Sequence, residues 1–143
     1  MAQINPATVA RELLRRVAVR RNLAQWSTTV LEPAGLTPAR HHLLLLDRLE
    51  AIERGDIERL IVLMPPGSAK STYVSTLFPP WYLARHPDHA IIAASHTAEL
   101  AERFGRRVRN LINEHSATLG ISLAPDIQAA NQRSEERRVG KEC

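Results

Sequence analysis

Residues 59–72 have the sequence Arg-Leu-Ile-Val-Leu-Met-Pro-Pro-Gly-Ser-Ala-Lys-Ser-Thr, which carries the strongest structural signal in this chain of 143 residues. The first six residues, 59–64, form a short apolar run that ends at two prolines, a pattern typical of a strand buried on both faces. Helical character follows from Ser71 to about Leu77. A buried strand, a glycine-containing turn and a helix in this order predict a loop that binds phosphate groups.

Each part of this loop has a predicted role. The backbone of residues 67–69 would form a cradle for phosphates, Lys70 would contact the outer phosphates, and Ser71 would ligate Mg²⁺. The strict motif has glycine at two positions where this chain has Met64 and Ala69, so an ordinary turn with a solvated lysine is the alternative. The predicted nucleotide-binding residues in the loop are Pro66, Gly67, Ser68, Ala69, Lys70, Ser71 and Thr72, with Lys70 as the catalytic residue.

Lysine is rare in this sequence. Lys70 and Lys141 are the only lysines among 19 basic residues, and all the others are arginines. A position that keeps lysine on such a background is consistent with a need for a compact, flexible ammonium group in place of a planar guanidinium. This observation supports the role predicted for Lys70.

Capping residues and apolar periodicity predict helices on both sides of the loop and a second buried strand beyond it. The helices are expected at 6–25, 37–55 and 97–114, and the second strand at 89–94. A strand, a loop, a helix, a strand and a helix in succession predict an α/β fold whose two strands pair in parallel through a right-handed crossover. We therefore expect an incomplete P-loop NTPase (RecA/ASCE-like) parallel sheet with flanking helices.

Composition indicates a globular protein without a membrane span. Hydrophobic residues make up 44% and charged residues 24% of the chain, no apolar run approaches the ~20 residues of a spanning helix, and we see no secretory signal. The formal net charge of +4 permits contact with nucleic acid without indicating it. Five arginines in the first helix favour a solvated face, with DNA or partner contact as the alternative. They are Arg11, Arg15, Arg16, Arg20 and Arg21.

The last eleven residues, 133–143, differ from the rest because they are dense in charge and have no apolar period. Their sequence resembles the translation of a common sequencing adapter, which would make Cys143, the only cysteine, foreign to the natural protein. We expect this tail to take no packed position. The chain then divides into an N-terminal helix and loop (1–36), a partial P-loop ATPase domain (37–132) and a non-native tail (133–143).

A resemblance to a known family extends over about residues 25–130. Met-Pro-Pro-Gly-Ser-Ala-Lys-Ser-Thr at 64–72 is similar to the phosphate-binding loop of phage large terminases, and three flanking segments are similar to their surroundings in that family. These segments are Leu-Glu-Ala-Ile-Glu-Arg-Gly-Asp (49–56), Phe-Pro-Pro-Trp-Tyr-Leu (78–83) and Ala-Ser-His-Thr-Ala-Glu-Leu-Ala-Glu-Arg-Phe-Gly (94–105).

The resemblance implies an ATPase motor that uses ATP and Mg²⁺ to move double-stranded DNA into a prohead. It further implies a homo-oligomeric ring, contacts with a portal and a small terminase subunit, and a location in the cytoplasm of the host bacterium. In such a protein an adenine-binding element precedes the first strand, and its histidine corresponds best to His41, with His42 as the other register. Trp26 would either stack on the base or pack in the protein interior.

Two features of the family are missing from the expected places. Many members carry an arginine inside the loop, where this chain has Gly67 and Ser68. Three arginines of the last predicted helix are candidates to replace it, although a solvated helix face is the favoured role for them. They are Arg103, Arg106 and Arg107. No acid pair follows an apolar strand, and the nuclease domain is absent, so we expect this piece alone to bind nucleotide weakly and not to hydrolyse it. A helicase-like or AAA-type P-loop ATPase and a module that binds no nucleotide are the alternatives.

Overall fold

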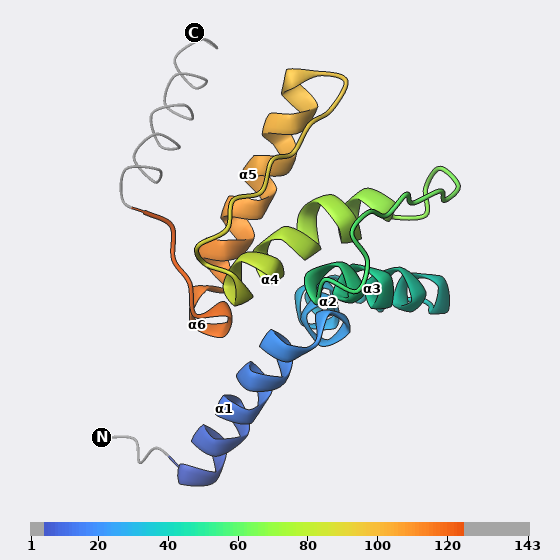
Figure 1. Ribbon diagram of the computed structural model, residues 1–143. Coiled ribbons are helices and arrows are strands. Elements are labelled where there is room, and N and C mark those ends of the chain that lie inside the picture. The colour runs from blue at the N-terminus through green and yellow to red at the C-terminus, as the bar shows by residue number, and fades with distance from the viewer. Residues whose placement is uncertain (1–4, 125–143) are drawn as a thin grey trace, which may run out of the picture.

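The computed structural model describes residues 5–124, which are predominantly helical (Figure 1). The longer helices alternate with short helices and with segments that are neither helix nor strand. In chain order the elements are α1 (Pro6–Arg21), α2 (Leu23–Leu31), the 3-10 turn η1 (Glu32–Ala34), α3 (Arg40–Glu53), the π-helix η2 (Thr72–Leu77), α4 (Phe78–Arg85), α5 (Ala98–Glu114) and α6 (Ser116–Leu119). The charged tail at 133–143 lies outside the described residues.

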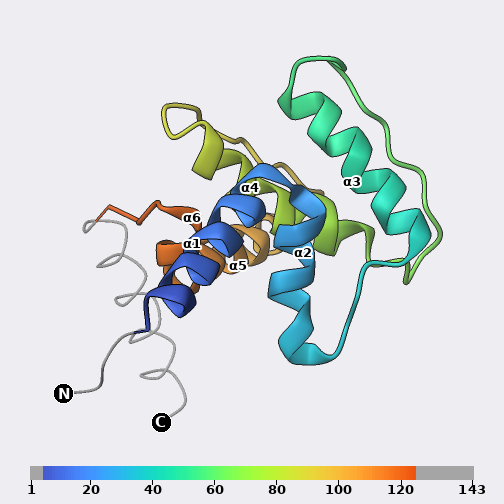
Figure 2. The same cartoon turned by 90° about the horizontal axis from the view of Figure 1, so that it is seen from below.

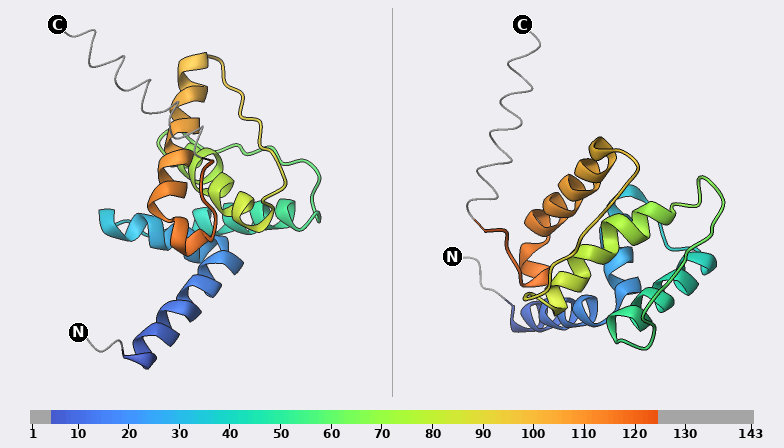
Figure 3. Two further views of the ribbon diagram at one scale, coloured as in Figure 1. Left: turned by 90° about the vertical axis from the view of Figure 1, so that its left-hand side faces the viewer. Right: turned by 45° about the horizontal axis from the view of Figure 1, so that its top comes forward.

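The predicted parallel sheet is wrong for the described part of the chain. Residues 59–64 and 89–94 are both extended, yet neither pairs as a strand within residues 5–124. Instead the first segment runs back along α3, and the second runs along α5 (Figures 2 and 3). The α/β P-loop (RecA/ASCE-like) fold expected from the sequence is therefore not present in this structure.

The side chains of residues 59–64 show why a local pattern could not predict strand pairing. Leu60, Val62 and Met64 pack against the helical core, whereas Ile61 and Leu63 are 85% and 89% exposed. An alternating segment of this kind needs one apolar surface to lie on, and helices provide that surface as well as a sheet does. The pattern predicted a strand, but strand pairing depends on a partner from residues distant in sequence.

The core is built from residues of α1, α2, α3, η2, α4, α5 and α6, and two tryptophans fill its centre. Trp26 from α2 is 0% exposed and Trp81 from α4 is 1% exposed. Each indole N–H donates a hydrogen bond to a backbone carbonyl, Trp26 Nε1 to Leu77 at 2.8 Å and Trp81 Nε1 to Val19 at 3.2 Å. Because a buried indole donor is satisfied in both cases, the two rings fix the positions of α2, α4 and α1 relative to one another.

Asn22 divides the first predicted helix into two. The helix expected over 6–25 ends at Arg21, and α2 then extends to Leu31 through residues that were expected to form a loop. The side chain of Asn22 accepts a hydrogen bond from the Gln25 N–H at 2.8 Å, so this residue is the N-cap of α2. The direction of the chain changes at that point, which Figure 2 shows as the corner between α1 and α2.

The helical run that follows the glycine loop is continuous from Lys70 to Arg85, and its first part is a π-helix. Pro79 and Pro80 explain this widening. Neither proline can donate a backbone hydrogen bond, and a proline ring in an α-helix clashes with the carbonyl four residues earlier. The wider turn before them gives those carbonyls room, and the prolines follow Phe78 in the first turn of α4. Among residues 5–124, no helix has the length and apolar character needed to cross a membrane.

Candidate phosphate-binding loop

Residues 65–69 form a tight turn between the extended segment 59–64 and the helix that begins at Lys70. The Ser68 N–H donates to the Pro65 carbonyl at 3.3 Å and closes the turn. Gly67 has φ of 81° and Ala69 has φ of 55°, so two left-handed residues flank Ser68. The expectation that Lys70 lies at the amino end of a helix is confirmed, whereas the parallel strand expected beside residues 59–64 is absent from the described residues.

Ala69 is the one residue other than glycine with a positive φ in the described part of the chain. For an L-residue the left-handed conformation costs about 1–2 kcal/mol, because Cβ approaches the following carbonyl oxygen. The strict sequence motif has glycine at this position, and glycine adopts a positive φ at little cost. Here an alanine adopts the same left-handed conformation. Strain of this kind, held by the surrounding structure, occurs mainly at binding and active sites.

The turn leaves a group of backbone donors free. The N–H groups of residues 72 and 73 both donate to the Ala69 carbonyl, at 2.9 and 3.3 Å. Within residues 5–124, the N–H groups of Gly67, Ala69, Lys70 and Ser71 donate to no other protein group. These donors lie at the amino end of a long helical run, where the helix dipole favours negative charge. The loop can therefore accept an anion of the size of a phosphate group.

Three polar side chains accompany these donors. Lys70 is half-buried and forms no ion pair within the described residues, so its ammonium group is available to a ligand. Ser71 is exposed. The Ser68 hydroxyl is buried without a hydrogen-bond partner in the described structure. Buried polar atoms are normally hydrogen-bonded, so this hydroxyl is an exception within the loop.

Of the two histidines at the start of α3, His42 is the one that forms a hydrogen bond with the loop. His42 Nε2 lies 3.0 Å from the Ser68 carbonyl oxygen, and its ring lies 4.3 Å from that of Tyr73. His41, the residue favoured as the adenine ligand, is exposed, and its ring lies 3.9 Å from the His42 ring. Both line a groove of about 510 Å³ together with residues 65–69. The sequence could not choose between these adjacent residues, because the choice depends on the rotation of α3 against the loop.

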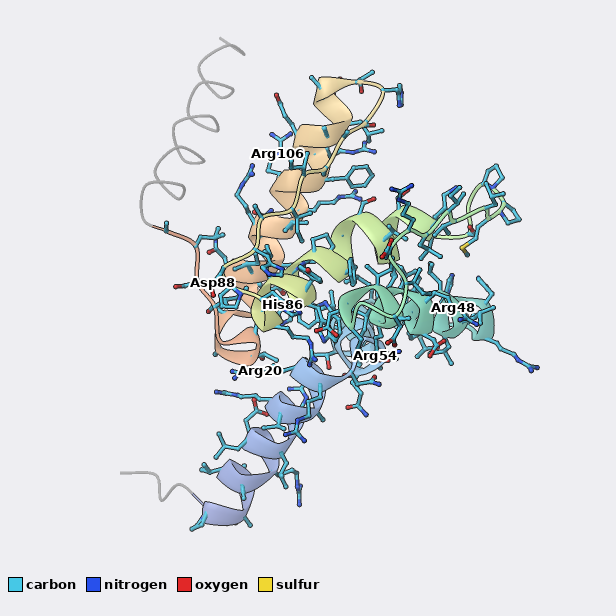
Figure 4. The ribbon with its side chains drawn as sticks, viewed as in Figure 1. Arg20, Arg48, Arg54, His86, Asp88 and Arg106 are labelled. Atoms are coloured by element: carbon cyan, nitrogen blue, oxygen red, sulfur yellow. The ribbon has the colours of Figure 1, made fainter. Side chains whose placement is uncertain are left out.

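Other residues predicted to act at the site lie elsewhere. Trp26 is buried in the core, so it cannot stack on a base as one interpretation proposed. Figure 4 shows Arg106 on α5, well away from the loop that precedes α4, and Arg103 and Arg107 belong to the same helix. The structure therefore brings none of the three candidate arginines to the loop.

The structure also contains a polar cluster that the sequence did not suggest, at the contact between α3 and the end of α4. Arg85 Nε and His86 Nε2 both bond Glu53 Oε1, at 2.6 and 2.8 Å, and the Glu53 side chain is only 5% exposed. Burial raises the pKa of the Glu53 carboxyl, but the hydrogen bonds from Arg85 and His86 outweigh it, so the pKa is lowered from its ordinary value. Figure 4 shows His86 and Asp88 far from the glycine loop.

The cluster of Glu53, Arg85 and His86 stabilises the contact between α3 and the end of α4. Its side chains are not those of a metal site. Within residues 5–124, no group of three or more histidine, cysteine, aspartate or glutamate side chains is placed to hold a metal ion. At the loop, the Ser71 hydroxyl is the residue that could ligate Mg²⁺, and the remaining ligands would come from phosphate oxygens and water. The comparisons with protein-family models, with curated proteins and with solved structures gave no match for this chain.

Proposed function

We propose that residues 66–72 bind the phosphate groups of ATP, and that the chain is the ATPase part of a DNA-packaging motor of the kind found in phage large terminases. The observation that carries the first half is the left-handed Ala69 beside Gly67, which leaves backbone donors free at the start of a helix. The second half depends on the sequence resemblance at 64–72 and its flanking segments. It does not depend on a parallel sheet.

The chemistry of the loop follows from its groups. Free N–H donors at 67 and 69–71 bind phosphate oxygens, and Lys70 adds a flexible positive charge for the outer phosphates. Ser71 contributes a hydroxyl ligand to Mg²⁺, and that ion neutralises charge on the phosphates when it is bound. Together these groups bind and orient a nucleoside triphosphate.

Hydrolysis needs two further components, an oriented water and a positive charge at the outer phosphate. Within residues 5–124, no arginine lies in the loop, and no acid pair follows an apolar strand. We therefore propose that this chain binds nucleotide without turning it over, and that turnover belongs to the longer protein. Movement of double-stranded DNA, ring formation, the portal and small-subunit contacts and a location in the host cytoplasm are part of the same proposal.

Nucleotide binding can be tested by titrating the chain with a fluorescent ATP analogue in the presence of Mg²⁺. Replacing Lys70 by alanine removes a charged hydrogen bond worth about 1.5–3 kcal/mol, so affinity should fall at least about tenfold. Lys141→Ala is the matched control, because it removes the other lysine and the same charge. Equal affinity of the wild-type and Lys70→Ala chains would refute phosphate binding at this loop.

The motor assignment needs a separate measurement on the longer protein. Phosphate release should depend on Lys70 and should increase when double-stranded DNA is added. Turnover by the present chain alone, if it depended on Lys70, would show that the components missing from the loop are supplied by these residues. A longer protein that hydrolyses ATP without any response to DNA would contradict the motor.

A further inference from the structure

His42 connects two segments that are 26 residues apart, the N-terminus of α3 and the glycine loop. Its Nδ1 accepts a hydrogen bond from the Ala39 N–H at 3.1 Å, and its Nε2 lies 3.0 Å from the Ser68 carbonyl oxygen. A backbone N–H can only donate and a carbonyl oxygen can only accept, so the proton of the ring must be on Nε2. One neutral imidazole thus satisfies two backbone groups.

The carbonyl that His42 holds controls the direction of a donor in the loop. The Ser68 C=O and the Ala69 N–H belong to the same planar trans peptide and therefore point in opposite directions. When the carbonyl is fixed toward α3, the Ala69 N–H is fixed toward the opposite side. That N–H is one of the free donors that we assign to phosphate binding.

The position of the His42 ring is itself restrained. The ring packs at 4.3 Å on Tyr73, which is only 2% exposed and lies in the first turns of the helix after the loop. His41 has a different environment, because it is exposed and makes no side-chain hydrogen bond within the described residues. His41 therefore has the same side chain and lines the same groove, but within the described residues it forms no hydrogen bond to the loop.

We propose that His42 is a positioning residue of the phosphate loop: its Nε2–H holds the Ser68 carbonyl, which keeps the Ala69 N–H directed at bound phosphates regardless of the base. This inference depends on the proposed function, since it requires a phosphate ligand at residues 66–72. The proposed role differs from adenine binding. If His42 only contacted adenine, replacing it would not change the affinity for a ligand that lacks a base.

The test compares two ligands, ATP and inorganic tripolyphosphate, each with Mg²⁺, on five chains: wild type, Lys70→Ala, His42→Phe, His42→Gln and His41→Phe. Phenylalanine keeps a ring against Tyr73 but forms neither hydrogen bond, and the amide of glutamine restores a donor near the position of Nε2. His42→Phe should lower the affinity for both ligands by the same factor, about fivefold for the loss of one neutral hydrogen bond. His42→Gln should recover part of the loss, and His41→Phe, which keeps a ring beside His42, should weaken tripolyphosphate binding less than His42→Phe does.

Each other result has a definite meaning. If His42→Phe weakened the binding of ATP but not of tripolyphosphate, His42 would contact the base. If the binding of both ligands were unchanged, His42 would have no role in positioning the loop. Either result overturns the inference. Wild-type chain that fails to bind tripolyphosphate in a Lys70-dependent way would instead refute the proposed function. Circular dichroism checks folding, and His42→Ala, which leaves space and creates no clash, replaces His42→Phe if that variant does not fold.

Discussion

Substitution of Ala69 by glycine should stabilise the protein, which is the reverse of the usual effect of this change. The left-handed conformation at φ of 55° costs an alanine about 1–2 kcal/mol, and glycine removes that cost. Glycine also gives the unfolded chain more freedom, which costs about 0.4–1 kcal/mol. The difference leaves a net stabilisation of roughly 0.5–1 kcal/mol, or a rise in Tm of about 2–4 °C for a domain of this size.

Urea and thermal unfolding followed by circular dichroism measure this effect directly. The control is Ala101→Gly inside α5, where the same change should destabilise by about 1 kcal/mol because the helix there is regular. Nucleotide binding should survive in Ala69→Gly, since the free N–H groups are unaltered. If Ala69→Gly were to destabilise the chain as much as Ala101→Gly does, residue 69 would not be left-handed, and the case for the loop would lose its main support.

Two further predictions concern stability away from the loop. Glu53→Gln should destabilise by about 2 kcal/mol at pH 7, as loss of a hydrogen-bonded charge does; because the folded pKa of Glu53 is lowered from 4.5, its contribution is present above pH 4.5 and is lost as the pH falls through the folded value. Urea titrations at several pH values should therefore show the wild type and Glu53→Gln converging in acid, and a constant difference would contradict this. Gly120→Ala should destabilise by about 2 kcal/mol in thermal unfolding, because its φ is 75° and because a Cβ would displace the Arg20 guanidinium, 2.7 Å away, from its hydrogen bonds to the Thr118 and Ala117 carbonyls. Gly35→Ala, with φ of 68° and nothing within 4 Å of its Cβ, should cost less, and equal losses would show that the Arg20 contact has no effect.

Local chemistry predicted several element boundaries correctly. Asn5 accepts a hydrogen bond from the Ala7 N–H, with Pro6 in the first turn of α1, and the Thr97 hydroxyl accepts from the Leu100 N–H at the start of α5. Each of these signals depends only on residues within one turn of the cap. Asn22 carries the same signal, and the continuous apolar period around it hid the break between α1 and α2.

Features that depend on distant residues were not predictable in the same way. The apolar runs at 59–64 and 89–94 were predicted to be paired strands, which is wrong for residues 5–124, because pairing requires a partner that a local window does not contain. The contact of His42 with Ser68 also depends on tertiary placement, since a shift of one residue moves a side chain about 100° around α3. The left-handed conformation of Ala69 was also not predictable from local sequence, because alanine is poorly suited to a positive φ.

The extended segment 59–64 has a consequence for how proteases treat this chain. Protease active sites bind substrates as extended backbone, and exposed connecting segments are preferred sites of cleavage. Arg59, which is exposed, provides a site for trypsin directly before the apolar run. Cleavage there would separate the sequence of α1, α2 and α3 from that of the loop and α4. The two pieces share one core through Trp26 and Trp81, so the nicked protein should migrate as a single species until it is denatured.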